Sequence, residues 1–381
     1  MAKEVAKKDG PILVLNSGSS SLKFGIYRPG ATDEEPLLTG SAEGIGRDNG
    51  SLHIRASDGK PLLQRDCIHE SQSDALGALA AALRQHTDDT PVAVGHRVVH
   101  GGPKLRKHQL ITPQVLNDLR SATHFAPLHI PQALRLIATA QSIFPSAAQF
   151  ACFDDAFHQT IPEVASHLPL PQRYFDAGIR RYGFHGISYE SLVHHFGAKL
   201  PERAIFAHLG NGSSLCALRN GISIDTTMGL TPTGGVPMAT RSGDLDPGVI
   251  VYLLRKEKLD PDKLEELLNH RCGLFALSSG EGDVKALEES ARRNDSKACL
   301  ALDVFAVSIR KTIGAYMALL GGAGLLVFTG GIGEHSDRIR SAATNGLERL
   351  GLTPDKIQII ATQEEQQIAR HCRAMMKNDC P

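Results

Sequence analysis

The sequence predicts an α/β protein of about two domains, and three observations support this prediction. The chain has 381 residues, and domains usually contain roughly 100–200. Strand-like apolar runs alternate along it with helical patterns, as in α/β folds. A strand, a turn rich in glycine, serine or asparagine, and a second strand occur at residues 12–27 and again at 204–218. This repetition indicates an internal duplication with one hairpin per lobe. Two unrelated tight turns are the alternative.

The individual elements follow from periodicity and turn residues. The first hairpin joins residues 12–15 and 22–27 through Asn16–Ser21, and the second joins 204–207 and 215–218 through His208–Ser214. Further strands are expected at 92–99, 151–153 and 325–328, and helices at 73–83, 131–140, 261–268, 298–320 and 339–350. The helix at 298–320 is long and largely apolar, so it is either a buried core helix or an interface element.

Composition and charge exclude several classes of protein. With 41 basic and 41 acidic side chains the formal net charge is zero, without the cationic field that non-specific nucleic-acid binding needs. An apolar content of 41% argues against global disorder. The longest apolar run, residues 319–328, falls short of the roughly 20 residues of a membrane span, and residues 1–14 lack the apolar core of a secretory signal. We therefore expect neither nucleic acid nor membrane as a partner.

The cysteines indicate a reducing compartment. Seven of them, an odd number, are scattered at positions 67, 152, 216, 272, 299, 372 and 380. No CxxC pair occurs, so neither a disulfide framework nor a zinc ribbon is indicated. A cytoplasmic location is expected.

Three glycine-rich turns each follow a predicted strand. They lie at Asn16–Ser21, His208–Ser214 and Gly330–Gly333. Backbone N–H groups freed of side chains can converge there on an anion. The P-loop pattern is absent and no GxGxxG follows the first strand, which weakens a Rossmann dehydrogenase. One such turn is usually structural, but three together favour a nucleotide phosphate or sugar.

The sequence also has four polar clusters, two of which stand at the ends of predicted strands. They are residues 95–102, 153–158, 180–186 and 240–244, and they bring together arginines, histidines and aspartates. The functional interpretation is a cationic pocket for a phosphoryl group and a carboxylate, with a protein carboxylate holding Mg²⁺. The alternative is ordinary salt bridges and solvated histidines. Zinc fits poorly, since no His or Cys set has ligand spacing.

Seven segments, in order, resemble the acetate kinase family of the acetate and sugar kinase, Hsc70 and actin superfamily. They are residues 15–23, 95–102, 153–158, 182–186, 208–214, 240–247 and 330–334, and the likeness runs from about residue 12 to about residue 370. The resemblance implies two lobes, each with an actin-like (ribonuclease H-like) βββαβαβα core, and a nucleotide cleft between them. The expected lobes are residues 1–157, joined by the C-terminal helix at about 365–381, and residues 158–364, which would bind nucleotide and dimerise.

The resemblance also implies the reaction. A family member transfers a phosphoryl group reversibly from ATP to acetate, giving acetyl phosphate and ADP, with Mg²⁺ (Mn²⁺ is possible), as a cytoplasmic homodimer. A propionate or butyrate kinase of the same family is the alternative. The rival from another class is a nucleotide-binding module without a small acceptor.

Site residues carry over by motif position. The catalytic groups would be Asp154, Arg97, His185 and Arg241, and the metal ligands, directly or through water, Asn16 and Glu364. The substrate pocket would be lined by Arg97, Val99, Leu128, Phe184 and Pro232. The nucleotide contacts would be Lys23, His208, Leu209, Gly210, Asn211, Gly212, Asp283, Val284, Lys285, Gly330, Gly331, Ile332, Gly333 and Glu334.

Acid–base chemistry narrows two of these roles. Acetate, with a pKa of roughly 4, is ionised at pH 7 and needs no general base. Asp154 is therefore expected to orient Mg²⁺ or its waters. Val99 leaves room for a methyl group but crowds longer chains, and one CH₂ is worth about 1–3 kcal/mol, so acetate should be preferred over propionate.

The sequence departs from the family pattern at several positions. Tyr189 stands where the pattern has a second histidine, and Lys285 where it has an arginine. Lys285 lacks the planar fork of arginine, so the nucleotide preference is open. The usual TPLEG segment is Thr231–Gly235, and the usual NEE is Gln363–Glu365.

Overall fold

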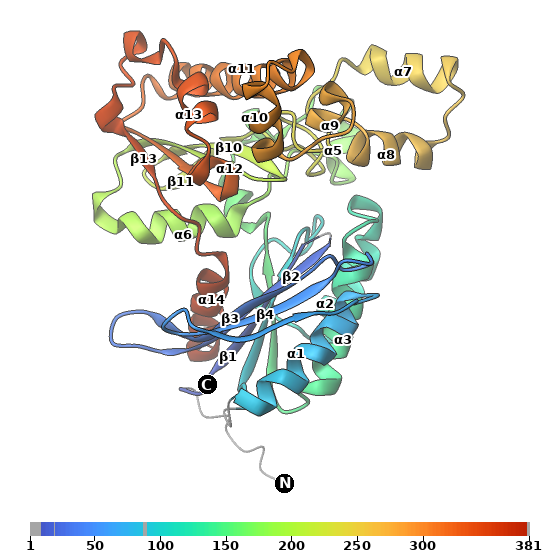
Figure 1. Ribbon diagram of the computed structural model, residues 1–381, viewed down its shortest axis with the longest axis vertical. Coiled ribbons are helices and arrows are strands. Elements are labelled where there is room, and N and C mark those ends of the chain that lie inside the picture. The colour runs from blue at the N-terminus through green and yellow to red at the C-terminus, as the bar shows by residue number, and fades with distance from the viewer. Residues whose placement is uncertain (1–8, 19, 87–89, 379–381) are drawn as a thin grey trace. The chain divides into compact units, whose positions relative to one another are not determined.

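The computed structural model describes residues 9–18, 20–86 and 90–378. It divides into two compact units, which are described one at a time (Figure 1). Unit 1 comprises residues 1–156 and 363–381, and unit 2 comprises residues 157–362. Ser19 of the first turn and Cys380 lie outside the described residues.

Unit 1 is built on an eight-stranded sheet with the order β5-β4-β3-β2-β1-β6-β8-β7. The strands are β1 (Ile12–Ser17), β2 (Ser21–Pro29), β3 (Glu34–Glu43), β4 (Ser51–Ala56), β5 (Pro61–Asp66), β6 (Ala93–Val98), β7 (Gln109–Leu110) and β8 (Ala148–Phe153). β1 and β2 form the predicted antiparallel hairpin, while β6 pairs parallel with both β1 and β8. The first hairpin is therefore confirmed, and its turn lies next to the carboxyl end of β6.

Helices cover both faces of this sheet. They are α1 (Gln72–His86), α2 (Pro113–Ser121), α3 (Ile130–Ile143) and α14 (Glu364–Asn378). Val94 packs into the core shared with α1 and α3. Gly95, the next residue, faces α14, where an added Cβ would lie 2.6 Å from Cys372 Sγ. Since neighbouring strand residues point to opposite faces, α14 packs on the face opposite to α1 and α3.

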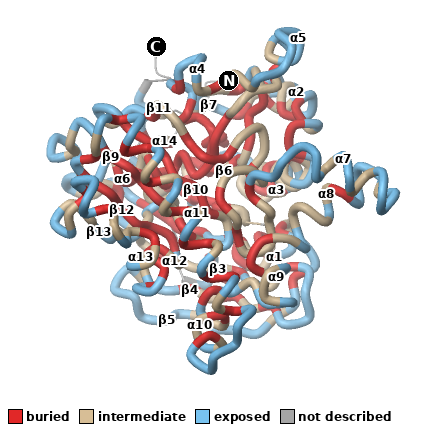
Figure 2. The backbone as a smooth tube through the Cα atoms, turned by 90° about the horizontal axis from the view of Figure 1, so that it is seen from above, coloured by how far each residue is buried: buried red, intermediate tan, exposed pale blue. Residues whose placement is uncertain are grey.

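Unit 2 is built on a five-stranded sheet with the order β11-β10-β9-β12-β13. The strands are β9 (Arg203–Leu209), β10 (Ser213–Arg219), β11 (Ile222–Thr226), β12 (Leu325–Thr329) and β13 (Ile357–Ile359). β9 and β10 form the second predicted hairpin, and β12 pairs parallel with β9 and β13. Figure 2 shows the central strands of the sheets largely in the red of buried backbone.

The helices of unit 2 also form layers on the two faces of the sheet. They are α4 (Glu163–Ser166), α5 (Gln172–Asp176), α6 (Gly186–Phe196), α7 (Pro247–Lys256), α8 (Pro261–His270), α9 (Gly273–Ser278), α10 (Val284–Arg292), α11 (Ser296–Leu320), α12 (Gly330–His335) and α13 (Asp337–Thr344). Ile205 and Ala207 of β9 pack with α11, whereas Phe206 packs with α6. The strand thus contributes alternate residues to two cores.

The two units share one topology. In each, three antiparallel strands come first, and two more join parallel to the first, as in β3-β2-β1-β6-β8 and β11-β10-β9-β12-β13. The helix α6 follows β8 but belongs to unit 2, and α14 follows β13 but belongs to unit 1. The predicted α/β fold with a duplicated core is confirmed.

Three details refine the predicted elements. The helix expected at 339–350 is wrong in its second half, because α13 ends at Thr344 and Gly346 adopts a left-handed φ of 81° before a short 3-10 turn. The glycine run after β12 is the first turn of α12 rather than a loop. One side of α11 is buried in the core, whereas Leu300, Val307 and Leu319 of the same helix are exposed. Within the described ranges, no helix combines the length and the apolar character that crossing a bilayer requires.

Candidate functional site

Three oxygen-bearing side chains meet at the end of β1 in unit 1. The Asn16 amide donates to Glu364 Oε2 and to Glu365 Oε1, both at 2.8 Å. α14 begins at Glu364, so its packing on the sheet delivers two carboxylates to the strand end. The two predicted metal ligands are therefore neighbours, and Glu365 is a third oxygen-bearing residue that the motif comparison did not assign. Carboxylate and amide oxygens are the donor set that Mg²⁺ prefers.

Arg97 and Asp154 form an ion pair beside this cluster. Arg97 Nη2 donates to Asp154 Oδ2 at 2.7 Å, and Nη1 donates to the Ser17 carbonyl at 3.1 Å. The Asp154 side chain is 1% exposed and that of Arg97 15%. Burial disfavours the charged guanidinium, but the charges of Asp154 and Glu364 outweigh it and raise the pKa of Arg97 above its usual value. Arg97 is thus a fixed cation that is also held to the first turn.

Parallel pairing explains why these two residues meet. In β6 and β8, Val98 is the register partner of Phe153, so Arg97 lies one residue before the end of β6 and Asp154 directly follows β8. Carboxyl ends of adjacent parallel strands lie at one edge of a sheet. The sequence placed both residues at strand ends, and the sheet order brings them together.

Gln72 is a residue of this region that sequence reasoning missed. It begins α1 and is buried. Its Oε1 accepts from Ser17 Oγ at 2.6 Å, and its Nε2 donates to the Gly18 carbonyl at 2.6 Å. Both sides of the side-chain amide therefore hold the turn between β1 and β2. No local signal marks Gln72, because it is separated from Ser17 by 55 positions.

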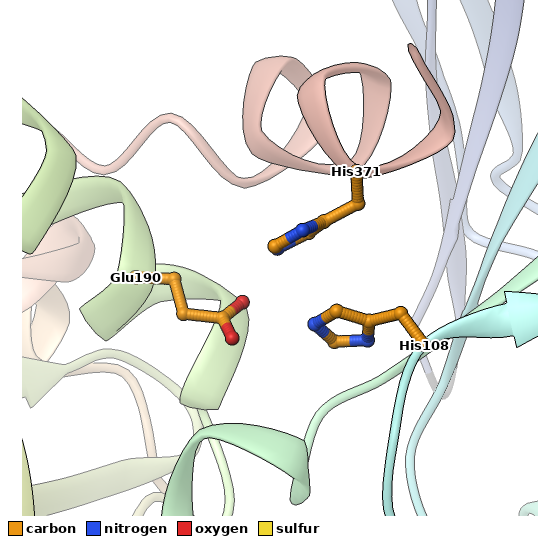
Figure 3. A group of neighbouring side chains, drawn as sticks. All are labelled: His108, Glu190 and His371. Carbon is orange, nitrogen blue, oxygen red and sulfur yellow. The ribbon is translucent and has the colours of Figure 1, made fainter. Parts of the chain in front are cut away.

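Two histidines also lie near the end of β8. The rings of His108 and His371 stand 4.0 Å apart (Figure 3). His108 Nδ1 accepts from the backbone N–H of Phe153 at 3.0 Å, the residue directly before Asp154. Figure 3 also labels Glu190, which belongs to α6 of unit 2. His108 therefore supports the backbone that carries Asp154, and His371 packs on the His108 ring.

The remaining expected residues of unit 1 are more exposed. Val99 is half-buried directly after β6, and Leu128 is 41% exposed before α3. Lys23 is exposed on β2, where it is the register partner of Asn16. Phe184 and Pro232, the other expected pocket residues, are buried in unit 2.

In unit 2, His185 and Arg241 converge on the second glycine turn. A Cβ added at Gly212 would lie 3.2 Å from His185 Nε2 and 3.3 Å from Arg241 Nη1. Arg241 Nη1 also donates to the Pro232 carbonyl at 3.1 Å. Glycine leaves this space open, so a guanidinium and an imidazole both border the turn.

The His185 ring also stacks on His208. The ring centroids are 4.2 Å apart and the planes 19° apart. His208 Nδ1 is hydrogen-bonded to Ser188 Oγ at 2.8 Å, which reaches Thr362 Oγ1 at 3.0 Å. The stacking and these hydrogen bonds fix the planes of both rings beside the second glycine turn.

Two of the three expected nucleotide segments lie together. A Cβ added at Gly330 would lie 2.7 Å from the Leu209 carbonyl oxygen, which joins the glycine turn after β12 to the second hairpin. Glu334 Oε1 accepts from the Gly330 N–H at 3.1 Å and from the Thr362 N–H at 3.3 Å. Glu334 thus fixes the backbone of this turn.

The third segment has a different environment. Asp283 is the N-cap of α10 and accepts from the Ala286 N–H. The Val284 side chain belongs to the core with α11, and Lys285 is exposed. An added Cβ at Gly282 would lie 2.8 Å from the Ala239 carbonyl, so this segment adjoins the loop that carries Arg241.

Comparison with known proteins identifies the family of this chain. The sequence model of the acetokinase family matches residues 11–377. The chain is 40% identical over 393 residues to the acetate kinase of Nitrobacter hamburgensis, with 96% of each chain covered. Its structure resembles a propionate kinase from Francisella tularensis, with a TM-score of 0.86, 34% identity, and 95% and 98% of the two chains covered. It also resembles Porphyromonas gingivalis acetate kinase, with a TM-score of 0.84, 31% identity, and 96% and 100% covered. The chain therefore belongs to the acetokinase family.

Proposed function

We propose that this protein transfers the terminal phosphoryl group of ATP reversibly to acetate, giving ADP and acetyl phosphate. The observation that carries the proposal is the fixed Arg97, held between Asp154 and the Ser17 carbonyl beside the Asn16 and Glu364 oxygens. A cation locked next to a hard-metal donor set suits a carboxylate acceptor and a metal-bound phosphate. A module that only clamps ATP has no need of it.

The residues of unit 1 hold the acceptor and the metal. Asn16 and Glu364, with Glu365 beside them, would hold Mg²⁺, which when bound neutralises phosphate charge. Arg97 binds and orients the carboxylate of acetate, and Asp154 keeps the guanidinium in place. Because acetate is already ionised at pH 7, no protein group removes a proton from it.

The residues of unit 2 hold the phosphoryl donor. Arg241 and His185 donate hydrogen bonds to the oxygens of the transferring group, where charge accumulates during transfer. Backbone N–H groups of the turns at 210–212 and 330–331 bind the remaining phosphates and the sugar. Phosphoryl transfer depends mainly on such positioning and on electrostatic stabilisation.

The first experiment measures acetyl phosphate formation with acetate and ATP or GTP in the presence of Mg²⁺. We expect acetate-dependent turnover, and a loss on the order of 10²–10³ in kcat for Arg241→Ala. Arg219→Ala, an exposed change at the end of β10, is the matched control. ATP turnover that does not depend on acetate, or an Arg241→Ala enzyme with normal kcat, would refute the proposal.

The acceptor is acetate rather than propionate in this proposal, with a propionate kinase as the alternative. Val99 is half-buried at the end of β6, close in sequence to Arg97. Its two methyl groups crowd a longer chain, and one CH₂ is worth about 1–3 kcal/mol. We expect kcat/KM to favour acetate, and Val99→Ala to narrow the ratio about tenfold or more. A wild-type kcat/KM for propionate that equals or exceeds the value for acetate would favour the alternative.

We further propose a cytoplasmic homodimer formed through unit 2. The helix α7 of unit 2 has ten residues, and none of them is buried (Figure 2). Three of its apolar or aromatic residues, Val249, Val251 and Tyr252, are 40–59% exposed. An apolar helix with no buried residue suits a partner surface, and the expected family dimer supplies a second copy. Light scattering tests this: we expect a dimer for the wild type and a monomer for Tyr252→Glu. A monomeric wild type would contradict it.

A further inference from the structure

Tyr189 is the departure from the family pattern for which the structure gives a role. It lies on α6 with a fully buried side chain. Its ring packs against Phe157, His158 and Phe206, with centroids 5.7–6.3 Å away. A buried tyrosine hydroxyl usually finds a hydrogen-bond partner, and here that partner belongs to the second hairpin.

The Tyr189 hydroxyl is connected to His185 through one residue. Tyr189 Oη lies 2.5 Å from Ser214 Oγ, and Ser214 Oγ lies 2.9 Å from His185 Nδ1. Ser214 is on β10 and fully buried. The three groups therefore form a line that runs from the α6 core to one nitrogen of the imidazole.

The other nitrogen of the same ring faces the candidate site. His185 Nε2 borders the open space at Gly212, together with Arg241 Nη1. His185 also adopts a left-handed φ of 58°, a conformation that costs a non-glycine residue free energy and persists only where its surroundings enforce it. Stacking on His208 and the bond to Ser214 fix the ring from two sides.

We propose that Tyr189 is a positioning residue that sets the tautomer of His185 through Ser214. The Tyr189 hydroxyl donates to Ser214 Oγ, and the Ser214 hydroxyl then donates its single proton to His185 Nδ1. The neutral imidazole consequently carries its own proton on Nε2, the nitrogen beside Gly212 and Arg241. Given the function proposed above, this N–H donates to an oxygen of the transferring phosphoryl group.

The alternative tautomer shows why the phenol matters. Without the phenol, Ser214 Oγ can accept from an Nδ1–H of His185. Nε2 would then present a lone pair to the negatively charged phosphoryl oxygens, which is repulsive instead of stabilising. The effect is electrostatic, and the fold of unit 2 does not need to change for it to occur.

The first readout is spectroscopic and does not depend on catalysis. With ¹⁵N-labelled histidine at pH 8, where an ordinary imidazole is neutral, the ring nitrogens report which one carries the proton. His185→Gln identifies the signals. We expect an Nε2–H tautomer in the wild type and increased Nδ1–H character in Tyr189→Phe and in Ser214→Ala. An Nδ1–H tautomer in the wild type, or no change in both variants, would overturn the inference.

The second readout is kinetic, and it separates this inference from the proposed function. Tyr189→Phe should lower kcat about tenfold, less than the loss on the order of 10²–10³ for removal of a donor itself, with KM for acetate and ATP little changed. Tyr182→Phe is the matched control, because it removes a buried tyrosine hydroxyl that donates to the Gly178 carbonyl. It should leave both readouts unchanged, and an equal loss of kcat there would reduce Tyr189 to a packing role. A moved tautomer with unchanged kcat would keep the positioning role and overturn the catalytic role of His185.

Discussion

The first hairpin (β1–β2) and the second hairpin (β9–β10) occupy the same place in their sheets but are held by different means. In unit 1 the turn is closed by a backbone bond from the Gly18 N–H to the Ser21 carbonyl, and side chains from distant elements also hold it: Gln72 bonds Ser17 and Gly18, and Arg97 bonds the Ser17 carbonyl. In unit 2 the turn is closed by its own residues, with the Gly210 N–H donating to the Gly212 carbonyl and Ser213 Oγ donating to the Gly210 carbonyl, and the neighbouring segment meets it through backbone, since Gly330 lies against Leu209. A duplicated topology therefore fixes where a turn lies but not which interactions fix it.

The strands next to these hairpins also differ in whether they contact the turn through a side chain or through backbone. β6 and β12 are the equivalent parallel neighbours of β1 and β9. β6 carries Gly95, His96 and Arg97, whereas β12 is apolar up to Thr329 and buried throughout. In unit 1 the strand supplies a charged side chain to the turn. In unit 2 the residue directly after the strand, Gly330, is a glycine that lets the backbone itself approach. Unit 1 should therefore respond to charge changes and unit 2 to added bulk.

The largest expected effect is that of bulk at Gly330. Gly330→Ala forces a left-handed φ of 77° on alanine and puts a Cβ 2.7 Å from the Leu209 carbonyl oxygen. Strain and overpacking together should cost about 2–5 kcal/mol of unfolding free energy and abolish most nucleotide binding. Chemical denaturation and ATP titration measure the two losses.

Gly331→Ala is the matched control for that prediction. Apart from its chain neighbours and the backbone of its own helix, no atom of the described residues lies within 4 Å of a Cβ added there, and the residue lies in the first turn of α12. Its effect on stability should stay within about 1 kcal/mol. Equal losses of unfolding free energy in the two variants would mean that the close approach at Leu209 does not hold the second hairpin.

The next effect concerns pH and should be confined to unit 1. Burial lowers the pKa of His96 to about 4, although a hydrogen bond to Gln149 opposes this. Between pH 6.5 and pH 4, His96 is protonated in the unfolded chain but remains neutral in the folded chain. The contribution of His96 to the free energy of unfolding is therefore complete above pH 6.5 and decreases as the pH falls below it. The difference between the pKa of His96 in the unfolded and in the folded chain corresponds to about 3 kcal/mol of unfolding free energy.

Hydrogen exchange of β6 and β12 amides at several pH values, corrected for intrinsic rates, measures this difference between the units. Protection of β6 should decline more steeply with acid than that of β12, which carries no ionisable side chain. His96→Gln should remove the part of the decline between pH 6.5 and 4. Parallel declines in the wild type, or an unchanged decline in the variant, would contradict the assignment to His96.

Sequence reasoning reached what is local or repeated and missed what depends on the fold. Both hairpins were predictable, because glycine, serine and asparagine between short apolar runs mark a turn directly. The end of α13 was also marked, by Gly346, although the apolar periodicity suggested a longer helix. Motif order identified Arg97 and Asp154, and parallel strand order explains their contact.

The supporting residues had no such signal. Gln72 meets the first turn only after α1 packs on the sheet, and Glu365 reaches Asn16 only because α14 joins unit 1. Ser214 and Tyr189 meet across the layer between α6 and β10, 25 positions apart in the chain. A sequence motif can therefore identify residues that are expected to bind a ligand. The residues that hold them in place depend on packing between distant segments, which a motif does not record.

The smallest effect on stability is expected for Gln72→Glu, which tests the side-chain bonds that distinguish the first hairpin from the second. Gln72→Glu keeps an acceptor for Ser17 Oγ but replaces the donor to the Gly18 carbonyl with a carboxylate oxygen, so the two oxygens repel. The cost should be about 1–2 kcal/mol, with a clear fall in kcat, since Ser17 also accepts from Arg97. Gln114→Glu on α2 is the matched control, because it also loses a donor, to Asp118 Oδ2, but at an exposed site. The two like charges there should cost only about 0.2–0.5 kcal/mol, and kcat should not change. If Gln72→Glu retains the stability and kcat of the wild type, the first hairpin does not depend on its side-chain clamp, and the contrast with the second hairpin fails.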